Sequence, residues 1–176
     1  MPCVLWLTGL SGAGKTTLAT AIQDRLYLLD IRSYVLDGDV IRAGLNSDLG
    51  FSRKDREENI RRIAEVSKLF VDAGIVPIVS FISPFRKDRE IARNRLSPIR
   101  FIEVYLKCDL ATCEARDVKG FYKKARAGEI KEFTGLESPY EEPDRPELIV
   151  DTANLSIPES VDSIMNYLTI KIRKLP

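Results

Sequence analysis

The chain has 176 residues, of which 44% are hydrophobic and 30% charged, with a formal net charge of +1. This length suits one domain with a real core, and we expect residues 1–176 to form a single domain. The near-zero charge gives no support to a general nucleic-acid or membrane-surface role, and no apolar run approaches the roughly 20 residues of a membrane helix.

Apolar, strand-like runs alternate with amphipathic stretches along the chain. The predicted strands cover residues 4–7, 33–36, 75–82, 101–106 and 147–150. The predicted helices cover residues 15–28, 53–73, 85–96, 110–116 and 158–174. A strand followed by a helix, repeated five times, predicts an α/β fold: a parallel five-stranded sheet with helices on both faces.

Residues 119–144 interrupt this alternation. The segment is rich in Lys, Arg, Glu, Gly and Pro and contains few core-forming residues. A long polar excursion inside a compact domain is usually functional or disordered. We expect a mobile lid that brings cations over phosphates and excludes water, with a solvated surface helix as the alternative.

The stretch GLSGAGKTT, residues 9–17, lies between the first predicted strand and the first predicted helix and contains the pattern G-x-x-x-x-G-K-[ST]. Such a loop points backbone N–H groups at phosphate oxygens, and the following helix adds the positive end of its dipole. We expect Lys15 to reach the β- and γ-phosphates of a nucleoside triphosphate and the Thr16 hydroxyl to bind Mg²⁺. The predicted contacts of the loop with this nucleotide are Gly9, Leu10, Ser11, Gly12, Ala13, Gly14, Lys15, Thr16 and Thr17. A glycine turn formed by chance is the alternative.

A loop of this type can serve hydrolysis, switching or phosphoryl transfer. The chain has no N-K-x-D pattern for guanine and no evident Asp-Glu pair closing a strand, and the third predicted strand leads into Ser83 and not into an acid. A small-molecule kinase is therefore favoured over a GTPase or a motor ATPase.

Candidate acceptor-site residues follow the second and third predicted strands, at the edge of the sheet that the loop shares. Asp37 and Asp39, in LDGDVIR, could orient Mg²⁺ through water and accept a proton from an attacking hydroxyl, although a turn with a helix N-cap is the alternative. Arg56 and Asn59 are three residues apart and share a helix face that could read an anion and a nucleoside edge. Ser83, in SFISPFR, lies on the same edge, or serves only as an N-cap.

Together these stretches resemble the adenylylsulfate kinase (APS kinase) family. The matching stretches are GLSGAGKTT, LDGD, IRAGLNSDLGFS, DREENIRR, SFISPFR, CEARDVKGFYKKARAGEIKEFTG and PYEEP, and they cover nearly all of residues 4–151. The loop alone would not separate this family from gluconate or shikimate kinases, but the later stretches in this order are specific. The resemblance implies transfer of the ATP γ-phosphoryl group to the ribose 3′-hydroxyl of adenosine 5′-phosphosulfate, with Mg²⁺ as cofactor.

The resemblance also implies residue roles. Substrate-binding residues by family position are Asp39, Arg42, Phe51, Arg56, Asn59, Ile82, Ser83, Lys119 and Phe133. With the roles argued above, the candidate catalytic residues are Lys15, Asp37, Asp39 and Ser83. Phe51 and Phe133 would sandwich the adenine, and Arg116 would join the ATP contacts. Some family descriptions make the serine a phosphorylated intermediate; we expect direct in-line transfer instead.

Other expectations concern partners and compartment. Three cysteines without metal-ligand spacing, and no visible secretory signal, are typical of a cytoplasmic protein with reduced thiols. The expected partners are the small molecules ATP and adenosine 5′-phosphosulfate, without nucleic acid or membrane, and the family is often a homodimer. A different small-molecule kinase, acting on gluconate, shikimate or a nucleotide, and a nucleotide-binding module without turnover remain the alternatives. Val40 departs from the family pattern, which usually has Asn after DGD.

Overall fold

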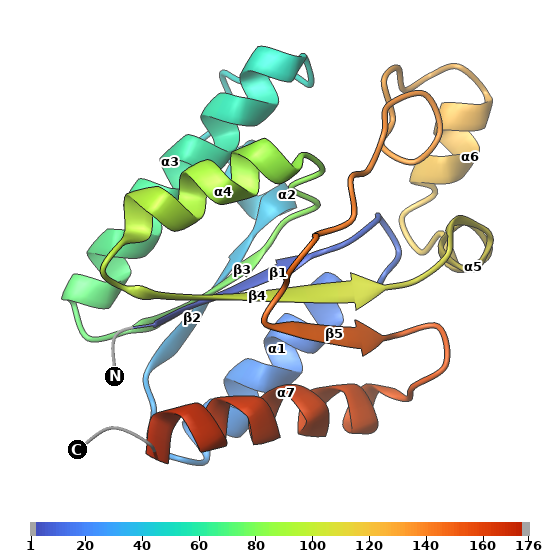
Figure 1. Ribbon diagram of the computed structural model, residues 1–176. Helices are drawn as coiled ribbons and strands as arrows, with labels where there is room; N and C mark the ends of the chain where they lie inside the picture. Colours follow the sequence, from blue (N-terminus) through green and yellow to red (C-terminus); the bar gives the residue numbers. More distant parts are fainter. Residues whose placement is uncertain (1–2, 174–176) are drawn as a thin grey trace.

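A five-stranded, wholly parallel sheet forms the centre of the computed structural model, which describes residues 3–173 (Figure 1). The strands are β1 (Cys3–Thr8), β2 (Ser33–Asp37), β3 (Val76–Ser80), β4 (Arg100–Lys107) and β5 (Leu148–Asp151), in the order β2-β3-β1-β4-β5. The predicted α/β fold is therefore confirmed. Because all five strands run in the same direction, their carboxyl ends meet at one edge, where ligands of such sheets bind.

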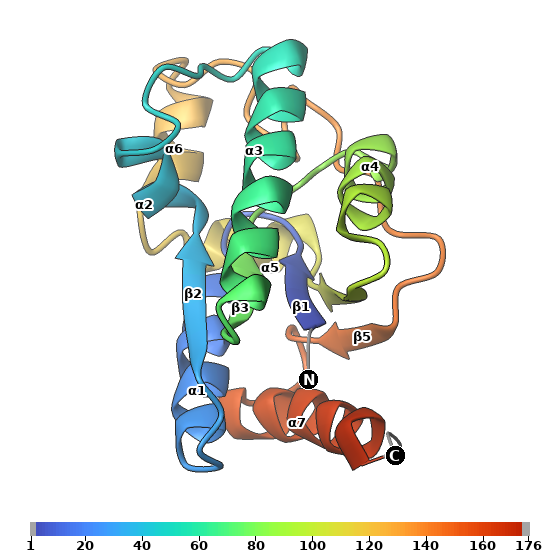
Figure 2. The same cartoon turned by 90° about the vertical axis from the view of Figure 1, so that its left-hand side faces the viewer.

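Four long helices cover the sheet in two layers (Figures 1 and 2). They are α1 (Lys15–Tyr27) with α7 (Ile157–Arg173) on one face, and α3 (Arg53–Asp72) with α4 (Arg86–Leu96) on the other. Successive residues of β1 point to opposite faces, so Leu5 and Leu7 enter the core beneath α1 and α7, while Val4 and Trp6 enter the core beneath α3 and α4. The two cores pack against both faces of the sheet and so fix the positions of the strand ends.

Three short helices complete the described fold: α2 (Gly38–Ala43), α5 (Leu110–Arg116) and α6 (Phe121–Arg126). The helix α5 was predicted, whereas α2 and α6 were not. At α2, the Asp37 carboxylate caps the helix by accepting a hydrogen bond from the backbone N–H of Asp39 at 3.0 Å. Helix α6 lies inside the lid segment (residues 119–144). It buries Tyr122 and Ala125, so it is not simply a solvated surface helix.

The last part of the lid segment, residues 139–144, is anchored and is named the strap here. The backbone N–H of Glu141 donates to the Pro84 carbonyl at 2.8 Å, and Arg86 Nε donates to the Glu142 carbonyl at 2.5 Å. Arg89, which is 3% exposed, donates to the carbonyls of Ser83 and Glu141 and to the Glu103 carboxylate at 2.6, 2.7 and 2.7 Å. The strap is thus fixed to the start of α4.

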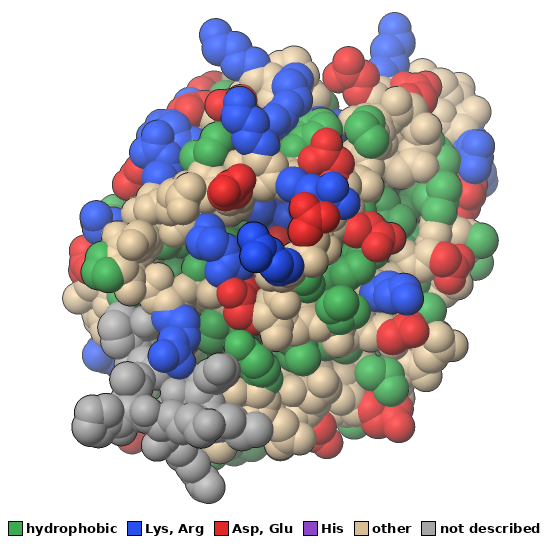
Figure 3. Space-filling view, in the orientation of Figure 1, with side chains coloured by type: hydrophobic (Ala, Val, Ile, Leu, Met, Phe, Trp, Pro, Cys, Tyr) green, Lys and Arg blue, Asp and Glu red, His purple; other side chains and the backbone are tan. Residues whose placement is uncertain are grey.

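On the face shown in Figure 3, basic and acidic side chains are interspersed, and neither sign forms an extended patch. Across residues 3–173, no helix has both the length and the apolar character needed to cross a membrane.

Candidate functional site

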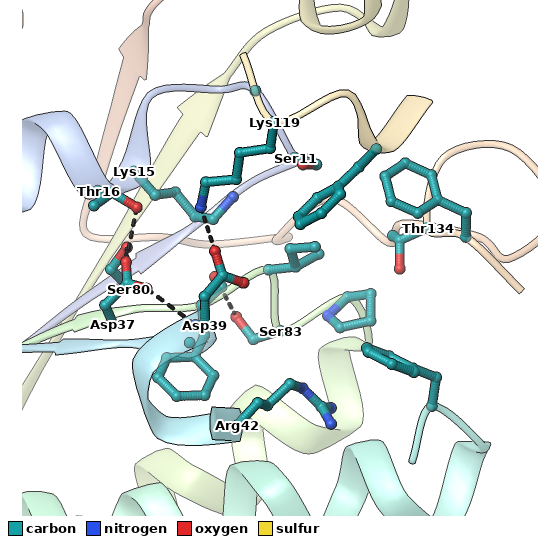
Figure 4. Close-up of a pocket in the computed structure, with 18 of the residues that line it drawn as sticks. Ser11, Lys15, Thr16, Asp37, Asp39, Arg42, Ser80, Ser83, Lys119 and Thr134 are labelled. Atoms are coloured by element: carbon teal, nitrogen blue, oxygen red, sulfur yellow. Dashed lines mark hydrogen bonds and ion pairs between the residues drawn. The ribbon is translucent and has the colours of Figure 1, made fainter. Parts of the chain in front are cut away.

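A cavity of about 520 Å³ lies at the carboxyl ends of the strands, between the P-loop (residues 9–17), α2, α3 and the lid segment (Figure 4). It brings together most of the residues that the sequence singled out. Those that line it are Ser11, Gly12, Gly14, Lys15, Thr16, Thr17, Asp37, Asp39, Arg42, Phe51, Arg56, Asn59, Ile82, Ser83, Lys119 and Phe133. The predicted site residues that do not line it are Gly9, Leu10, Ala13 and Arg116.

The glycines of the P-loop are required by close packing and by left-handed backbone. A Cβ on Gly12, where φ is +79°, would lie 2.7 Å from the carbonyl oxygen of Cys113. Gly14, at φ +89°, is the N-cap of α1, a conformation that residues with a Cβ rarely adopt. Ala13 is buried in the core beneath the loop, which explains its absence from the cavity wall. The loop therefore packs its back on α5 and leaves its front to the cavity.

Lys15 lies over the P-loop itself. Its Nζ donates to the carbonyl oxygens of Gly9 at 3.0 Å and Leu10 at 2.7 Å. Burial lowers the pKa of Lys15 to about 8, because desolvation disfavours the charged ammonium. The protonation state of this lysine therefore responds to anions placed in the cavity.

The carboxylates of Asp37 and Asp39 have different surroundings (Figure 4). Asp37 accepts hydrogen bonds from the hydroxyls of Thr16 at 2.7 Å and Ser80 at 3.4 Å, besides capping α2. Asp39 forms an ion pair with Lys119 of the lid segment. Asp37 is therefore a helix N-cap, as the alternative interpretation had it, and both carboxylates also line the cavity. Ser80, the last residue of β3, was not singled out from the sequence.

The Ser83 hydroxyl is engaged in the protein interior. It accepts a hydrogen bond from Trp6 Nε1 at 3.1 Å and donates to Thr8 Oγ1 at 3.0 Å, and the residue is 2% exposed. Tyr140, whose pKa burial raises to about 12, also contacts the Thr8 hydroxyl at 2.9 Å. Ser83 has φ of 40°, and Arg89 holds its carbonyl. These contacts give Ser83 a structural use, and it is not the N-cap of α4, which is Phe85.

Two arginines form the opposite wall of the cavity. Arg42 donates to the Gly50 carbonyl at 2.9 Å, and its guanidinium carbon lies 4.5 Å from the centre of the Phe51 ring. Arg56 donates to the Phe51 carbonyl, to Thr134 Oγ1 and to the Glu132 carbonyl at 2.8, 2.9 and 2.7 Å. Burial lowers the pKa of both arginines. Arg56 thus joins α3 to the lid segment, 76 residues away in the chain.

Tyr122 and Phe133 of the lid segment pack against each other, and Tyr122 also contacts the P-loop. Phe133 packs edge-on against Tyr122, with 5.0 Å between ring centres, and the Tyr122 hydroxyl donates to the Ser11 carbonyl of the P-loop at 2.9 Å. The sequence analysis missed Tyr122 and Thr134. Thr134 follows the predicted residue Phe133, and Tyr122 lies three residues after Lys119 inside the predicted lid segment.

Arg116 lies behind the P-loop instead of in the cavity wall. It donates to the Thr152 carbonyl at 2.7 Å, and Thr152 Oγ1 donates to the Ala13 carbonyl at 3.0 Å. Cys108 and Cys113 are free and buried nearby. This arrangement ties the end of β5 to the back of the loop.

Comparison with known proteins points to one family. The family model for adenylylsulphate kinase matches residues 1–151. The chain is 62% identical over 166 residues to a probable adenylyl-sulfate kinase of Halalkalibacterium halodurans, covering 94% of this chain and 82% of that protein. It is 58% identical over 167 residues to an adenylyl-sulfate kinase of Geotalea uraniireducens, covering 95% and 80%. A solved APS kinase of Mycobacterium tuberculosis, in complex with AMPPNP and APS, is 44% identical with a TM-score of 0.93, covering 96% of this chain and 98% of that one.

Proposed function

The chain belongs to the adenylylsulphate kinase family, and on this premise we propose that it transfers the γ-phosphoryl group of ATP to the ribose 3′-hydroxyl of adenosine 5′-phosphosulfate. The observation that carries the proposal is the composition of the single cavity described above. A P-loop forms one wall, two arginines and two phenylalanines belong to another, and two carboxylates lie between them. A donor nucleotide and an acceptor nucleotide can therefore bind in the same cavity.

At the donor end, the P-loop and the N-terminus of α1 offer backbone N–H groups to phosphate oxygens. Lys15, drawn from the loop carbonyls toward the phosphates, would neutralise charge that builds up during transfer. The lysine contributes position and charge rather than covalent chemistry, which is what phosphoryl transfer demands of a protein.

Mg²⁺ fits the oxygen atoms at the start of α1 and the end of β2. The Thr16 hydroxyl and the Asp37 carboxylate lie 2.7 Å apart, and hydroxyl and carboxylate oxygens are the ligands that this ion prefers. Within residues 3–173 no group of three or more His, Cys, Asp or Glu could hold a metal, so the ion would depend on one or two protein oxygens together with phosphates and water. When bound, Mg²⁺ neutralises phosphate charge.

At the acceptor end, Arg42 and Arg56 provide positive charge for the phosphosulfate, and Phe51 and Phe133 provide aromatic faces for the adenine. Asp39 is the residue we assign as general base, because the Asp37 oxygens already serve Thr16, Ser80 and the cap of α2. Lys119 approaches Asp39 from the lid segment and would leave it for the anionic acceptor.

The acceptor is tested by a panel. ADP formation is measured with ATP and adenosine 5′-phosphosulfate, gluconate, shikimate or AMP as acceptor. We expect rapid ADP formation only when adenosine 5′-phosphosulfate is the acceptor. Preference for another acceptor would favour a different small-molecule kinase, and ADP release that is absent or independent of every acceptor would contradict the proposal.

A further inference from the structure

A buried pair of amides lies beside the acceptor end of the cavity. Asn46 is fully buried in the loop after α2 and does not line the cavity, and its Nδ2 donates to Oδ1 of Asn59 at 2.9 Å. Asn59, on α3, is 4% exposed and lines the cavity. Only one residue of this pair can therefore touch a ligand, and the other acts behind it.

The orientation of the pair has a physical cause. Asn46 Oδ1 is buried and has no hydrogen-bond partner among the described residues. Turning both amides around would instead bury the Asn46 NH₂ group without a partner. A buried unpaired N–H is rarer in proteins than an under-satisfied carbonyl oxygen, so the orientation in the structure is the favoured one. Asn46 is thereby fixed as the donor and Asn59 Oδ1 as the acceptor.

This orientation decides what Asn59 offers to the cavity. With Oδ1 engaged by Asn46, Nδ2 remains, and no described residue accepts a hydrogen bond from it. Asn46 Oδ1 is a fully buried atom without a partner, whereas the unpaired Asn59 Nδ2 is not fully buried. Because Asn59 lines the cavity, a ligand in the cavity can reach this Nδ2. Asn59 therefore offers N–H donors to a cavity that Arg42 and Arg56 also line.

The loop that carries Asn46 contacts both α2 and α3. The Asn46 backbone N–H donates to the Ile41 carbonyl at 2.9 Å. Arg62 of α3 forms a bidentate ion pair with Asp48 of the loop, with both contacts at 2.7 Å. The amide pair is therefore one of several contacts between this loop and its neighbours, and the others can be removed separately from it.

We propose that Asn46 is a positioning residue that locks the Asn59 carboxamide with its NH₂ group toward the cavity, as a hydrogen-bond donor to an acceptor atom of adenosine 5′-phosphosulfate. The inference rests on the proposed function and concerns the same site. It makes Asn46 a determinant of affinity for the acceptor substrate and leaves the ATP end untouched.

The first test replaces Asn46 by leucine, which has a similar size and removes both the donor and the unpaired carbonyl. Affinities for adenosine 5′-phosphosulfate and for a non-hydrolysable ATP analogue are measured separately by calorimetry. We expect about 3- to 10-fold weaker binding of adenosine 5′-phosphosulfate, the range of one net hydrogen bond, and unchanged binding of the ATP analogue. Unchanged acceptor affinity, or equal loss for both nucleotides, would overturn the inference.

A matched control separates the amide from the loop that carries it. Asp48→Asn breaks an exposed ion pair in the same loop and leaves Asn46 in place, so acceptor affinity should stay within about twofold. A loss equal to that of Asn46→Leu would show that loosening of the loop is sufficient, which contradicts a role for the amide. If Asn46→Leu does not fold, Asn46→Ser, which cannot reach Asn59, takes its place with the same expectation.

A double-mutant cycle tests whether Asn46 acts through Asn59. In an Asn59→Ala background, Asn46→Leu should cause no further loss of acceptor affinity. A further loss as large as that of Asn46→Leu alone would overturn the inference. The wild-type chain distinguishes failure of this inference from failure of the proposed function. If it binds adenosine 5′-phosphosulfate but does not turn it over, only the proposed function is contradicted. The acceptor affinities of the wild-type chain and of Asn46→Leu can still be compared.

Discussion

Lys15 is the residue whose charge the site controls most directly. Burial lowers its pKa to about 8, below the roughly 10.4 of a free lysine side chain, and its Nζ is turned onto two loop carbonyls. A bound triphosphate would raise this pKa again by placing negative charge beside the ammonium. ATP binding and proton binding at Lys15 are therefore linked.

The sign of this linkage gives a prediction about pH. Above about pH 8 the ligand-free protein loses the Lys15 proton, and ATP binding must take one up. We expect ATP affinity to be constant from pH 7 to 8 and then to fall, by up to about tenfold per pH unit. Calorimetry between pH 7 and 9.5 measures this, with Lys15→Met as the control that binds weakly and shows no such fall. A flat profile for the unchanged chain would contradict the assignment.

Asp39 and Asp37 are distinguished by neutral, isosteric replacements. Asp39→Asn should lower kcat by about 10²-fold or more, the scale of general-base catalysis. Asp37→Asn should mainly raise the Mg²⁺ concentration needed for half-maximal rate, because its carboxylate lies beside the Thr16 hydroxyl. Rates are measured at saturating nucleotides over a Mg²⁺ series. Full activity of the Asp39 variant would show that this carboxylate is not the base.

Ser83 is predicted to be dispensable for the chemical step. Its hydroxyl connects Trp6 and Thr8 in the interior, so Ser83→Ala should cost about 1 kcal/mol of unfolding free energy and keep at least a tenth of kcat. Both are measured on the same preparation, by urea unfolding and by ADP formation. A folded variant that binds both nucleotides but has no turnover would point to a phosphoserine intermediate.

At the scale of elements, the strap depends on one buried arginine. Arg89 joins the strap, the Ser83 carbonyl and Glu103 of β4, and its side chain is 3% exposed. Arg89→Met leaves Glu103, among the described residues, with only the more exposed Arg93 as an ion-pair partner. We expect a loss of about 3 kcal/mol in unfolding free energy, the cost of breaking a buried pair.

Arg86 is the matched control for Arg89, because it contacts the same strap from the same helix but is half exposed. Arg86→Met should cost less than about 1 kcal/mol. Urea unfolding of the two variants, side by side, measures the difference. Similar losses would show that the strap contributes little through its buried anchor.

The sequence predicts the elements that have a clear apolar pattern and misses the two short helices α2 and α6, for a physical reason. A 20-residue helix such as α3 repeats its apolar face several times, and β3 is a nearly continuous apolar run. Helix α2 has six residues and buries none, and α6 has six residues and buries two. Neither has enough periodicity to be recognised, and each is held in place by contacts from elsewhere in the chain.

The same distinction applies to the site. The P-loop and the DGD stretch are local patterns, and their places in the cavity follow from the sheet alone. The contacts of Arg56 with Thr134 and Glu132 span 78 and 76 residues, and the Trp6–Ser83 contact spans 77. No local pattern predicts such pairings. The hydrogen bonds of the Ser83 hydroxyl in the interior and the position of Arg116 behind the P-loop were therefore not foreseen.

At the scale of the whole molecule, the lid segment is attached at several points to the rest of the site. Tyr122 reaches the P-loop, Arg56 holds residues 132 and 134, and the strap is fixed to α4. The lid segment thus contacts both the P-loop and the wall of the cavity that contains Arg56. The homodimer that the family resemblance implies stays a prediction, which sedimentation analysis would decide.

The central claim is that one cavity passes a phosphoryl group from ATP to the 3′-oxygen of adenosine 5′-phosphosulfate. Phosphorus NMR of the running reaction tests it most directly, because it reports both the loss of the ATP γ-phosphate and the atom that receives it. We predict one new phosphomonoester signal, coupled to the ribose 3′-proton, that grows as ADP forms in equal amount. Release of inorganic phosphate in place of that signal, or a phosphate on another atom of the acceptor, would contradict the account.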